Sequence, residues 1–518
     1  MSFARIFSAQ HTLLNAKRID IEIDISKGLH TFSIVGLTDK AIDESKDRVS
    51  AAIKNSGFKP PKQKNEKLVV ALAPAHLKKN GPIFDVAIAV GYLKASKDIF
   101  FDANHKLFLG ELSLNGRLRS IEGILPLVRF AKGAGFKEVY IPYGNREEAS
   151  LIEGIDIYPA ETLKQIIDHI NIPKGEDEIP KPKIKKQEKI SFKKEIDKYS
   201  TDFSDIKGQE SAKRAMLVAA SGKHNIALYG PPGTGKTMLA KAFCSILPAL
   251  SFEESLDTTS IHSVSGVLDK PIISFPPFRS PHHTSSHVSI VGGGTNIRPG
   301  EITLAHNGVL FLDEFPEFDK RVIESLRQPL EDRVIHISRS KGSQIFPANI
   351  ILITAMNPCP CGYFGSNKKT CTCAPHHVMQ YQKKISGPIM DRIDLWVKVD
   401  DVNHEDLLSL DTEKSNSLEL SKKVVDARSK QKERFKKNNL SYKTNGELNG
   451  KDIKKCIELS DNVLKILNQA AKNLDLSARS YHKVIKVART IADLEDQNTI
   501  NENHILEALQ YRSKNEKI

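Results

Sequence analysis

The sequence has few of the residues that cross-link secreted proteins and none of the long apolar runs that cross membranes. It contains six cysteines, six methionines and one tryptophan among 518 residues. No run of about 18 apolar residues is present, so we expect no membrane-spanning helix. The start of the chain soon alternates polar and apolar side chains and lacks the apolar core of a signal peptide, so it reads as mature protein. So few cysteines in so long a chain argue against a disulfide framework and favour a cytoplasmic location.

Composition and charge are those of a soluble protein with several domains. The apolar fraction of 40% and the charged fraction of 27% are ordinary, and 518 residues predict two to four domains. A net charge of +13 allows a polyanionic partner such as nucleic acid. A generally basic proteome would produce the same charge, so charge alone does not identify the partner.

A phosphate-binding loop is the strongest local signal. The stretch GPPGTGKT fits the pattern of a glycine, four residues and then Gly-Lys-Thr, between a strand-like run 225–229 and a helix-like run 236–247. Such a loop presents backbone N–H groups to phosphate, with its lysine on the β- and γ-phosphates and its hydroxyl on Mg²⁺. We therefore expect ATP and Mg²⁺ to bind at Gly230, Pro231, Pro232, Gly233, Thr234, Gly235, Lys236 and Thr237.

Two further apolar stretches end in polar residues. Val309–Leu312 is typical of a parallel strand buried on both faces, and Asp313 and Glu314 follow it. Asp313 would hold Mg²⁺, and Glu314 would orient and polarise the attacking water. A third strand, 349–355, precedes Asn357, which resembles sensor 1 of such ATPases, the residue that hydrogen-bonds the γ-phosphate or the water. The alternatives are two acids that begin a helix and an asparagine that forms a turn before Pro358.

A four-cysteine motif follows Asn357 directly. Its pattern is C-x-C, nine residues and C-x-C, formed by Cys359, Cys361, Cys371 and Cys373. Four thiolates on a short hairpin could close a structural zinc site. His376 or His377 could replace a ligand, and the alternative is four reduced thiols in a cytoplasmic loop.

Two insertions lie between these motifs. Residues 331–348 predict a strand, a turn and a strand, with Arg339 and Lys341 near the tip, where they could contact DNA phosphates. Exposed basic turns are common, so ordinary surface residues are the alternative. Residues 263–307 are rich in Pro, Gly and Ser and predict a loop or hairpin. The stretch 275–300 within them carries three histidines, at 282, 283 and 287, with no acid or thiol among them, so we do not expect a metal there.

The N-terminal part, residues 1–172, resembles the proteolytic domain of Lon-type proteases. The resemblance is carried by NGPIFDVAIAV at 80–90, GELSLNGRLRSIEGIL at 110–125 and VYIPYGNREEA at 139–149. It places the nucleophilic serine at Ile83 and its lysine partner at Leu125. Neither residue supplies a hydroxyl or a base, so the resemblance implies the fold without the peptidase activity.

The remaining chain divides by composition. Residues 173–200 are rich in Lys and Pro, which predicts a basic linker, with a nucleic-acid-binding arm as the alternative. An ATPase core over 201–402 and a helical lid over 403–518 follow. Ser477 and Asn501 are expected to cap two lid helices. Arg479, in the first turn of its helix, resembles the sensor 2 arginine of AAA+ lids, with a surface arginine as the alternative.

Together these segments resemble the YifB/ComM family of magnesium-chelatase-like AAA+ proteins over nearly the whole chain. DFSDIKGQ, FRSPHHT, NPCPCGYFG and LSARSYHK add to the motifs above. The resemblance implies a multidomain α/β protein: an inactive Lon-like domain, an AAA+ P-loop NTPase core and a helical lid. It also implies a homohexamer in which Arg392 is an arginine finger that completes the neighbour's site, with a surface ion pair as the alternative. The implied function is a DNA motor, a branch-migration helicase in natural transformation; the alternative is a chelatase-like remodeller of a protein partner.

Overall fold

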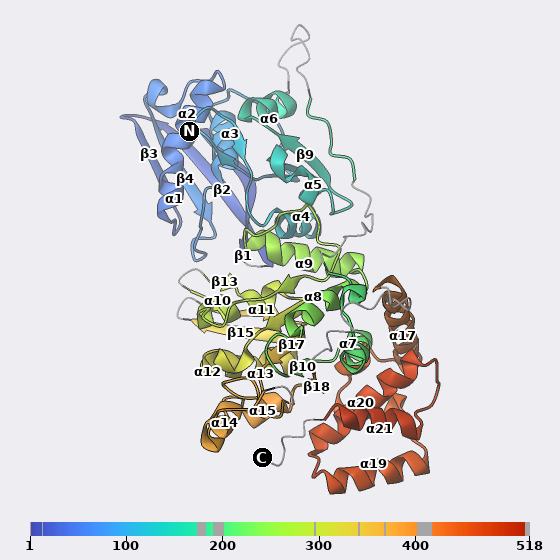
Figure 1. Cartoon of the computed structure of the whole chain (residues 1–518). Coiled ribbons are helices and arrows are strands. Elements are labelled where there is room, and N and C mark those ends of the chain that lie inside the picture. Colours follow the sequence, from blue (N-terminus) through green and yellow to red (C-terminus); the bar gives the residue numbers. More distant parts are fainter. Residues whose placement is uncertain are drawn as a thin grey trace. The chain divides into compact units, whose positions relative to one another are not determined.

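The computed structural model describes residues 2–12, 14–172, 183–189, 201–294, 297–339, 342–366, 369–400 and 417–512. Contacts divide the chain into two compact units (Figure 1). Unit 1 comprises Met1–Lys193 and Ser255–Ile273, and unit 2 comprises Lys194–Glu254 and Ser274–Ile518. Both units combine helices and strands, so the α/β class is confirmed. In the described part of the chain, no helix is long and apolar enough to cross a membrane.

Unit 1 is built on a mixed seven-stranded sheet in the order β3-β4-β2-β1-β5-β8-β9. The run IDIEIDI lies in β2, and its isoleucines are buried, as a period of two predicts. The strands of unit 1 are β1 Ser2–Thr12, β2 Asn15–Lys27, β3 Thr31–Val35, β4 Glu66–Ala73, β5 Lys106–Phe108, β6 Glu111–Leu112, β7 Leu118–Arg119, β8 Glu138–Pro142 and β9 Asp156–Ala160.

Apolar side chains from the helices of unit 1 share one core with this sheet. They are α1 Lys40–Asp43, α2 Ser45–Asn55, α3 Asp85–Ala95, α4 Ile124–Gly133, α5 Arg146–Ala149, α6 Leu163–Ile170 and most of α9 Phe252–Val264. Ile83 and Leu125 are both buried in the apolar core, so these two positions are packing positions. Residues 183–189, within the range interpreted as a linker, run along unit 1, where the Ile184 amide donates to His169 Nδ1 over 3.0 Å.

One segment of unit 1, Ser255–Ile273, lies in the sequence between the phosphate loop and β14. Leu256 and Ile272 pack against the core of unit 1. The Ser263 hydroxyl oxygen accepts a hydrogen bond of 3.0 Å from the Gly123 amide and bonds to the carboxyl group of Glu148. Burial raises the pKa of Glu148 to about 7. A segment close in sequence to the phosphate loop is therefore a structural part of the N-terminal unit.

Unit 2 contains a parallel five-stranded sheet in the order β11-β14-β17-β10-β18. All four residues of β14 and all six of β17 are buried, as continuous apolar runs predict for central parallel strands. These strands are β10 Ile226–Tyr229, β11 Phe278–Arg279, β14 Val309–Leu312, β17 Ile351–Met356 and β18 Leu395–Lys398, with short ladders β12 Gly292–Gly293 to β13 Arg298–Pro299 and β15 Val334–Arg339 to β16 Gly342–Pro347.

One apolar core joins this sheet to the C-terminal helices. Ser477 and Asn501 accept hydrogen bonds from the amides of Ser480 and His504, which confirms both predicted caps. The helices of unit 2 are α7 Glu210–Gly222, α8 Lys236–Ile246, α10 His287–Val291, α11 Glu301–Leu304, α12 Lys320–Ser325, α13 Arg327–Asp332, α14 Pro375–Gln382, α15 Gly387–Met390, α17 Ser417–Lys437, α18 Gly450–Cys456, α19 Asp461–Asn473, α20 Ala478–Leu494 and α21 Glu502–Gln510.

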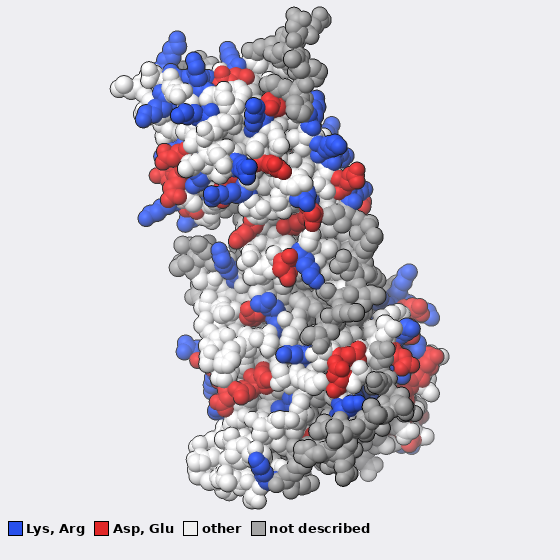
Figure 2. All heavy atoms as spheres, turned by 45° about the horizontal axis from the view of Figure 1, so that its top comes forward, with Lys and Arg blue, Asp and Glu red and all other residues white. Residues whose placement is uncertain are grey.

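Charged side chains are distributed without a dominant sign on the face that Figure 2 draws. Lys and Arg are interspersed with Asp and Glu there. The excess of positive charge in the sequence therefore does not by itself mark a nucleic-acid surface on this face.

Candidate ATPase site

The predicted phosphate-binding loop connects the end of β10 to the start of α8. Gly233 and Gly235 have positive φ angles of 79° and 86°, and no atom lies within 4 Å of a Cβ built on either residue. The backbone of both residues is therefore open toward a ligand. Gly230 is required for a different reason, because a Cβ there would lie 2.1 Å from the carbonyl oxygen of Val399. The loop thus offers the cradle that a triphosphate needs.

Lys236 lies inside this loop. Its Nζ donates hydrogen bonds to the carbonyl oxygens of Gly230, over 2.9 Å, and Pro231, over 2.7 Å. The same ammonium lies 3.4 Å from Oδ1 of Asn357, which follows β17. The adjacency of β10 and β17 brings these two residues together across 121 positions of sequence. Lysine and asparagine therefore lie side by side at the loop, as the predicted roles on one phosphate require.

The end of β14 supplies the acidic partner of the loop. The Thr237 hydroxyl donates to Oδ2 of Asp313 over 2.7 Å. A hydroxyl and a carboxylate oxygen at this separation form the donor set that Mg²⁺ takes beside a nucleotide. Thr237 and Asp313 thus fit the magnesium-binding role that the sequence predicts.

Glu314 has a constrained backbone and a histidine neighbour. Its φ of 51° lies in the left-handed region, and its amide donates to Oδ1 of Asp313 over 2.9 Å. Its Oε2 lies 3.1 Å from Nδ1 of His283. The sequence gives no signal for this pair, because it arises from the parallel pairing of β11 with β14. Among the described contacts, His283 is thus a neighbour of the predicted catalytic acid.

Arg392 and Arg479 meet at a different place in unit 2. Each donates from Nη2 to the carboxylate of Glu331 at the end of α13, Arg392 to Oε2 and Arg479 to Oε1. Arg392 also donates to the carbonyl oxygens of Arg327, over 3.2 Å, and Pro388, over 2.6 Å. Both arginines line a cavity of about 460 Å³, and no residue of the phosphate loop is among its lining residues. Glu331 was not identified from the sequence, because its partners are 61 and 148 residues away.

A buried ion pair supports this cavity. Asp394 Oδ1 lies 2.9 Å from Nζ of Lys483 on α20, and its Oδ2 accepts from the Asn225 amide over 2.9 Å. Although burial opposes it, the charge of Lys483 and the bond to His224 hold the pKa of Asp394 well below its usual range. Burial also lowers the pKa of Lys486, one helical turn farther along, to about 8. The pair ties the segment of Arg392 to the helix of Arg479.

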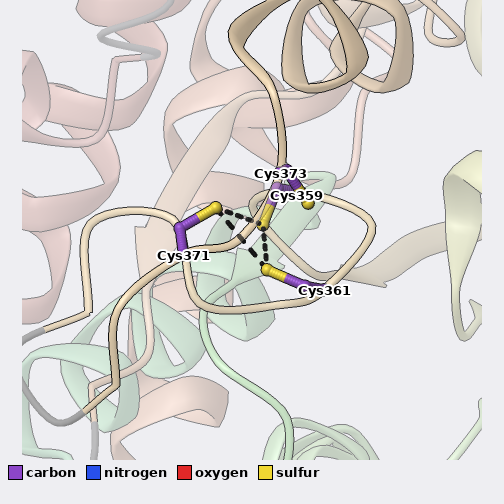
Figure 3. A group of neighbouring side chains, drawn as sticks. All are labelled: Cys359, Cys361, Cys371 and Cys373. Carbon is purple, nitrogen blue, oxygen red and sulfur yellow. Dashed lines mark hydrogen bonds between the residues drawn. The ribbon is translucent and has the colours of Figure 1, made fainter.

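The four predicted cysteines form one cluster (Figure 3). The sulfur of Cys359 lies 3.4 Å from that of Cys361 and 3.7 Å from that of Cys371, and the last two are 3.5 Å apart. All four sulfurs, including that of Cys373, lie within 4.8 Å of one another. Sulfurs at the corners of a tetrahedron, each about 2.3 Å from zinc, would be about 3.8 Å apart. The donor set therefore fits zinc.

This cluster adjoins the phosphate loop. Gly362 has a φ of 86°, and a Cβ on it would lie 2.7 Å from Cδ of Pro232. The amide of Phe364 donates to the Cys359 sulfur over 3.3 Å. In the part of the chain that the structure describes, His376 and His377 are not members of the cluster. The cysteine hairpin therefore packs on the loop that would hold the triphosphate.

The two predicted DNA contacts lie at the limit of what the structure describes. The hairpin β15–β16 confirms the predicted strand, turn and strand. Arg339 ends β15, but its side chain is outside the described set, and Lys341 falls outside the described residues altogether. Both remain predictions.

Comparisons with known proteins cover up to 99% of the chain. Residues 202–407 match the family described as magnesium chelatase, subunit ChlI; residues 21–145 match subunit ChlI of Mg-chelatase; and residues 414–512 match the ChlI C-terminal family. Competence protein ComM of Haemophilus influenzae is 40% identical over 99% of this chain and 98% of its own. Protein YifB of Escherichia coli is 36% identical over 99% and 97%. Lon protease 2 of Bacillus subtilis is 36% identical over 19% of this chain and 18% of its own.

Proposed function

Because the chain belongs to the YifB/ComM family of magnesium-chelatase-like AAA+ proteins, we propose that it is an ATP-driven DNA motor that works as a ring. The proposed activity is branch migration of joined DNA in natural transformation or homologous recombination. The Haemophilus influenzae relative is a competence protein, which supports the link to DNA uptake. The proposed place of action is the cytoplasm, where thiols such as those of the cysteine cluster stay reduced.

In the proposed hydrolysis, one protomer supplies the groups that bind the phosphates, the Mg²⁺ and the attacking water. Lys236 would bind the β- and γ-phosphates, and Asn357, 3.4 Å from its ammonium, would bind the γ-phosphate or the water. Thr237 and Asp313 would hold Mg²⁺, which neutralises charge on the phosphate oxygens when bound. Glu314 would orient the water and accept its proton. These roles use the side chains that the described structure gathers at the loop from the ends of β14 and β17, and His283 is a further neighbour of Glu314.

The observation that supports a ring-shaped assembly is that Arg392 and Arg479 lie apart from the phosphate loop of their own protomer. Arg392 and Arg479 converge on Glu331 in a cavity whose lining excludes the phosphate loop. Positive charge aimed at a transferring phosphoryl group is needed for fast hydrolysis. We infer that both arginines serve the nucleotide of a neighbouring copy, in a closed ring that is a homohexamer. Such an interface is heterologous, and its rotation closes the ring.

The DNA part of the proposal rests on the relative's name and on the hairpin that ends near Arg339 and Lys341. The experiment is ATP hydrolysis by purified protein with forked, four-way and no DNA, at two salt concentrations. We expect stimulation by branched DNA that falls as salt rises, because phosphate contacts release counterions. Lys236→Ala should abolish hydrolysis with and without DNA. An Arg339→Ala and Lys341→Ala double variant should keep basal hydrolysis and lose the stimulation.

Zinc is the proposed occupant of the cysteine cluster. Sulfur separations of 3.4–3.7 Å among Cys359, Cys361 and Cys371 support it. Metal analysis of protein purified without chelator should give about one zinc per chain, as expected for a four-thiolate site. A Cys359→Ser and Cys371→Ser double variant should lose it, and a Cys244→Ser variant, whose thiol is buried elsewhere, should keep it. Native protein without zinc would contradict the assignment.

A protein remodeller is the second candidate. The matches to magnesium chelatase subunit families favour it, because those families are named for metal insertion. The same ATPase assay separates the two candidates. Hydrolysis that no form of DNA stimulates, at any salt concentration, would favour the remodeller.

A further inference from the structure

One carboxylate links the two arginines that the proposed ring requires. Glu331 gives one oxygen to Arg392 and the other to Arg479. Two guanidinium groups this close repel each other unless an anion lies between them. Glu331 and Arg479 are both nearly half exposed, at 46% and 43%, whereas Arg392 is 13% exposed, so a ligand from outside the protomer would reach the group from the side of Glu331 and Arg479.

Arg392 and Arg479 have more N–H donors than their described hydrogen bonds use, so donors remain for a ligand from outside the protomer. A guanidinium group has five N–H donors. Among contacts with the described residues, Arg392 uses three: one on Arg327, one on Pro388 and one on Glu331. Arg479 uses one, on Glu331. Both arginines therefore keep N–H groups for phosphate oxygens while Glu331 holds them, so Glu331 need not be displaced.

The position of Glu331 depends on the β15–β16 hairpin. Glu331 is near the end of α13, which stops at Asp332, and β15 begins at Val334. The side chain of Gln328 in α13 accepts a bond of 3.2 Å from the His336 amide in β15. Helix and hairpin are thus fixed to each other at two places, through the chain and through this bond. A shift of the hairpin would therefore move the carboxylate relative to both guanidinium groups.

We infer that Glu331 is a positioning residue that holds Arg392 and Arg479 as one unit for the nucleotide of the neighbouring protomer. It acts through the arginines and does not touch the nucleotide. The inference rests on the proposed ring ATPase, but it does not depend on DNA as the substrate. Its link to the hairpin gives a physical route by which a ligand of the hairpin would change hydrolysis at the next site in the ring.

The first test is the kinetics of Glu331→Gln, which keeps the shape and removes the charge. Its kcat should fall about tenfold to hundredfold, the loss expected when groups that contact a transition state are displaced by about 1 Å. Its KM for ATP should not change, because the phosphate loop of the same protomer is intact. Glu331→Asp, which keeps the charge but has a carboxylate one methylene closer to the backbone, should give a kcat between those of Glu331→Gln and wild type. Wild-type kcat in Glu331→Gln, or a rise in KM alone, would overturn the inference.

The second test mixes variants within one ring. A Glu331→Gln protomer has an intact phosphate loop, and a Lys236→Ala protomer has Arg392 and Arg479 held by an intact Glu331. An equal mixture of the two variants should reach about one quarter of the wild-type rate of hydrolysis. Half of the protomers have an intact phosphate loop, and half of the neighbours of those protomers have an intact pair of arginines. Glu331→Gln mixed with a Lys236→Ala and Glu331→Gln double variant is the matched control and should not recover.

The outcomes separate the inference from the proposed function. Absence of recovery in the first mixture, with mixed rings verified by a tagged protomer, would overturn the positioning role across the interface. A wild-type protein that hydrolyses ATP without forming a ring would overturn the proposed function itself. A wild-type ring that ignores DNA would overturn the motor and leave both tests of Glu331 valid.

Discussion

Neutralising Asp394 should destabilise unit 2 by several kcal/mol. The Asp394 carboxylate lies 2.9 Å from the Lys483 ammonium, and both side chains are largely buried. At that separation the gross attraction is about 6 kcal/mol for an effective dielectric constant of about 20. Desolvation offsets part of it, but Asp394→Asn leaves Lys483 as an unpaired buried charge, so we expect a loss of about 3–5 kcal/mol. The Asn225 amide keeps an acceptor in this variant, which confines the change to charge.

A double-mutant cycle isolates the pair. Lys483→Met alone should destabilise by a similar amount, and the double variant should be more stable than the sum of the single losses by about 1.5–3 kcal/mol. The assay is urea unfolding followed by tryptophan fluorescence. Trp396 is the single tryptophan of the sequence and lies buried in β18, so the signal reports unit 2. A coupling energy below about 0.5 kcal/mol would refute the reasoning, because additive losses mean independent sites.

The pH dependence gives an independent check. The native pKa of Asp394 is held below its unfolded value, so its contribution is present above the unfolded pKa and is lost as pH falls. Wild type and Asp394→Asn should therefore converge in stability as pH falls below about 4, the unfolded pKa of an aspartate. A difference that persists unchanged at low pH would contradict the ion pair as its cause.

Three further predictions concern other sites. Glu148→Gln should stabilise the protein at pH 8 by up to about 3 kcal/mol and not at pH 4, because a native pKa of about 7 weakens the wild type as pH rises; equal melting temperatures of variant and wild type at pH 8 would contradict this. His283→Phe keeps the ring but not the N–H near Glu314, so basal kcat should change while the KM for ATP does not; His287→Ala is the control, and an unaltered kcat would mean that the contact is incidental. Gly362→Ala should weaken ATP binding in equilibrium titrations, because the added methyl group would press on Pro232 of the phosphate loop. An affinity for ATP equal to that of wild type would contradict this and would show that the loop accommodates the methyl group.

The parts of the site that the sequence predicts are those that are local or lie at strand ends. The phosphate loop lies between its own strand and helix, and Asp313 follows a fully buried strand. The cysteine cluster can likewise be predicted from the sequence, because its four cysteines fall within a stretch of 15 residues. Parallel strands bring their carboxyl ends to one edge, so the meeting of Asp313 with Thr237 also follows from the pattern.

What the sequence does not predict depends on tertiary contacts. Glu331 is one of two acids in α13, and only the packed structure distinguishes it by placing two distant arginines on its oxygens. His283 is one of three histidines in a loop with no acid among them, and its partner comes from the neighbouring strand. The segment Ser255–Ile273 lies between the ATPase motifs in sequence yet belongs to unit 1. No periodicity or spacing encodes these pairings.

Strand exchange on synthetic joined DNA is the measurement that tests the proposed motor most directly. Purified protein with ATP and Mg²⁺ should convert a labelled three-way or four-way substrate with homologous arms into its branch-migrated products. Lys236→Ala and Glu314→Gln should leave the substrate unconverted while still binding it. Conversion that survives Lys236→Ala, or a wild-type protein that hydrolyses ATP but never moves the branch, would contradict the account.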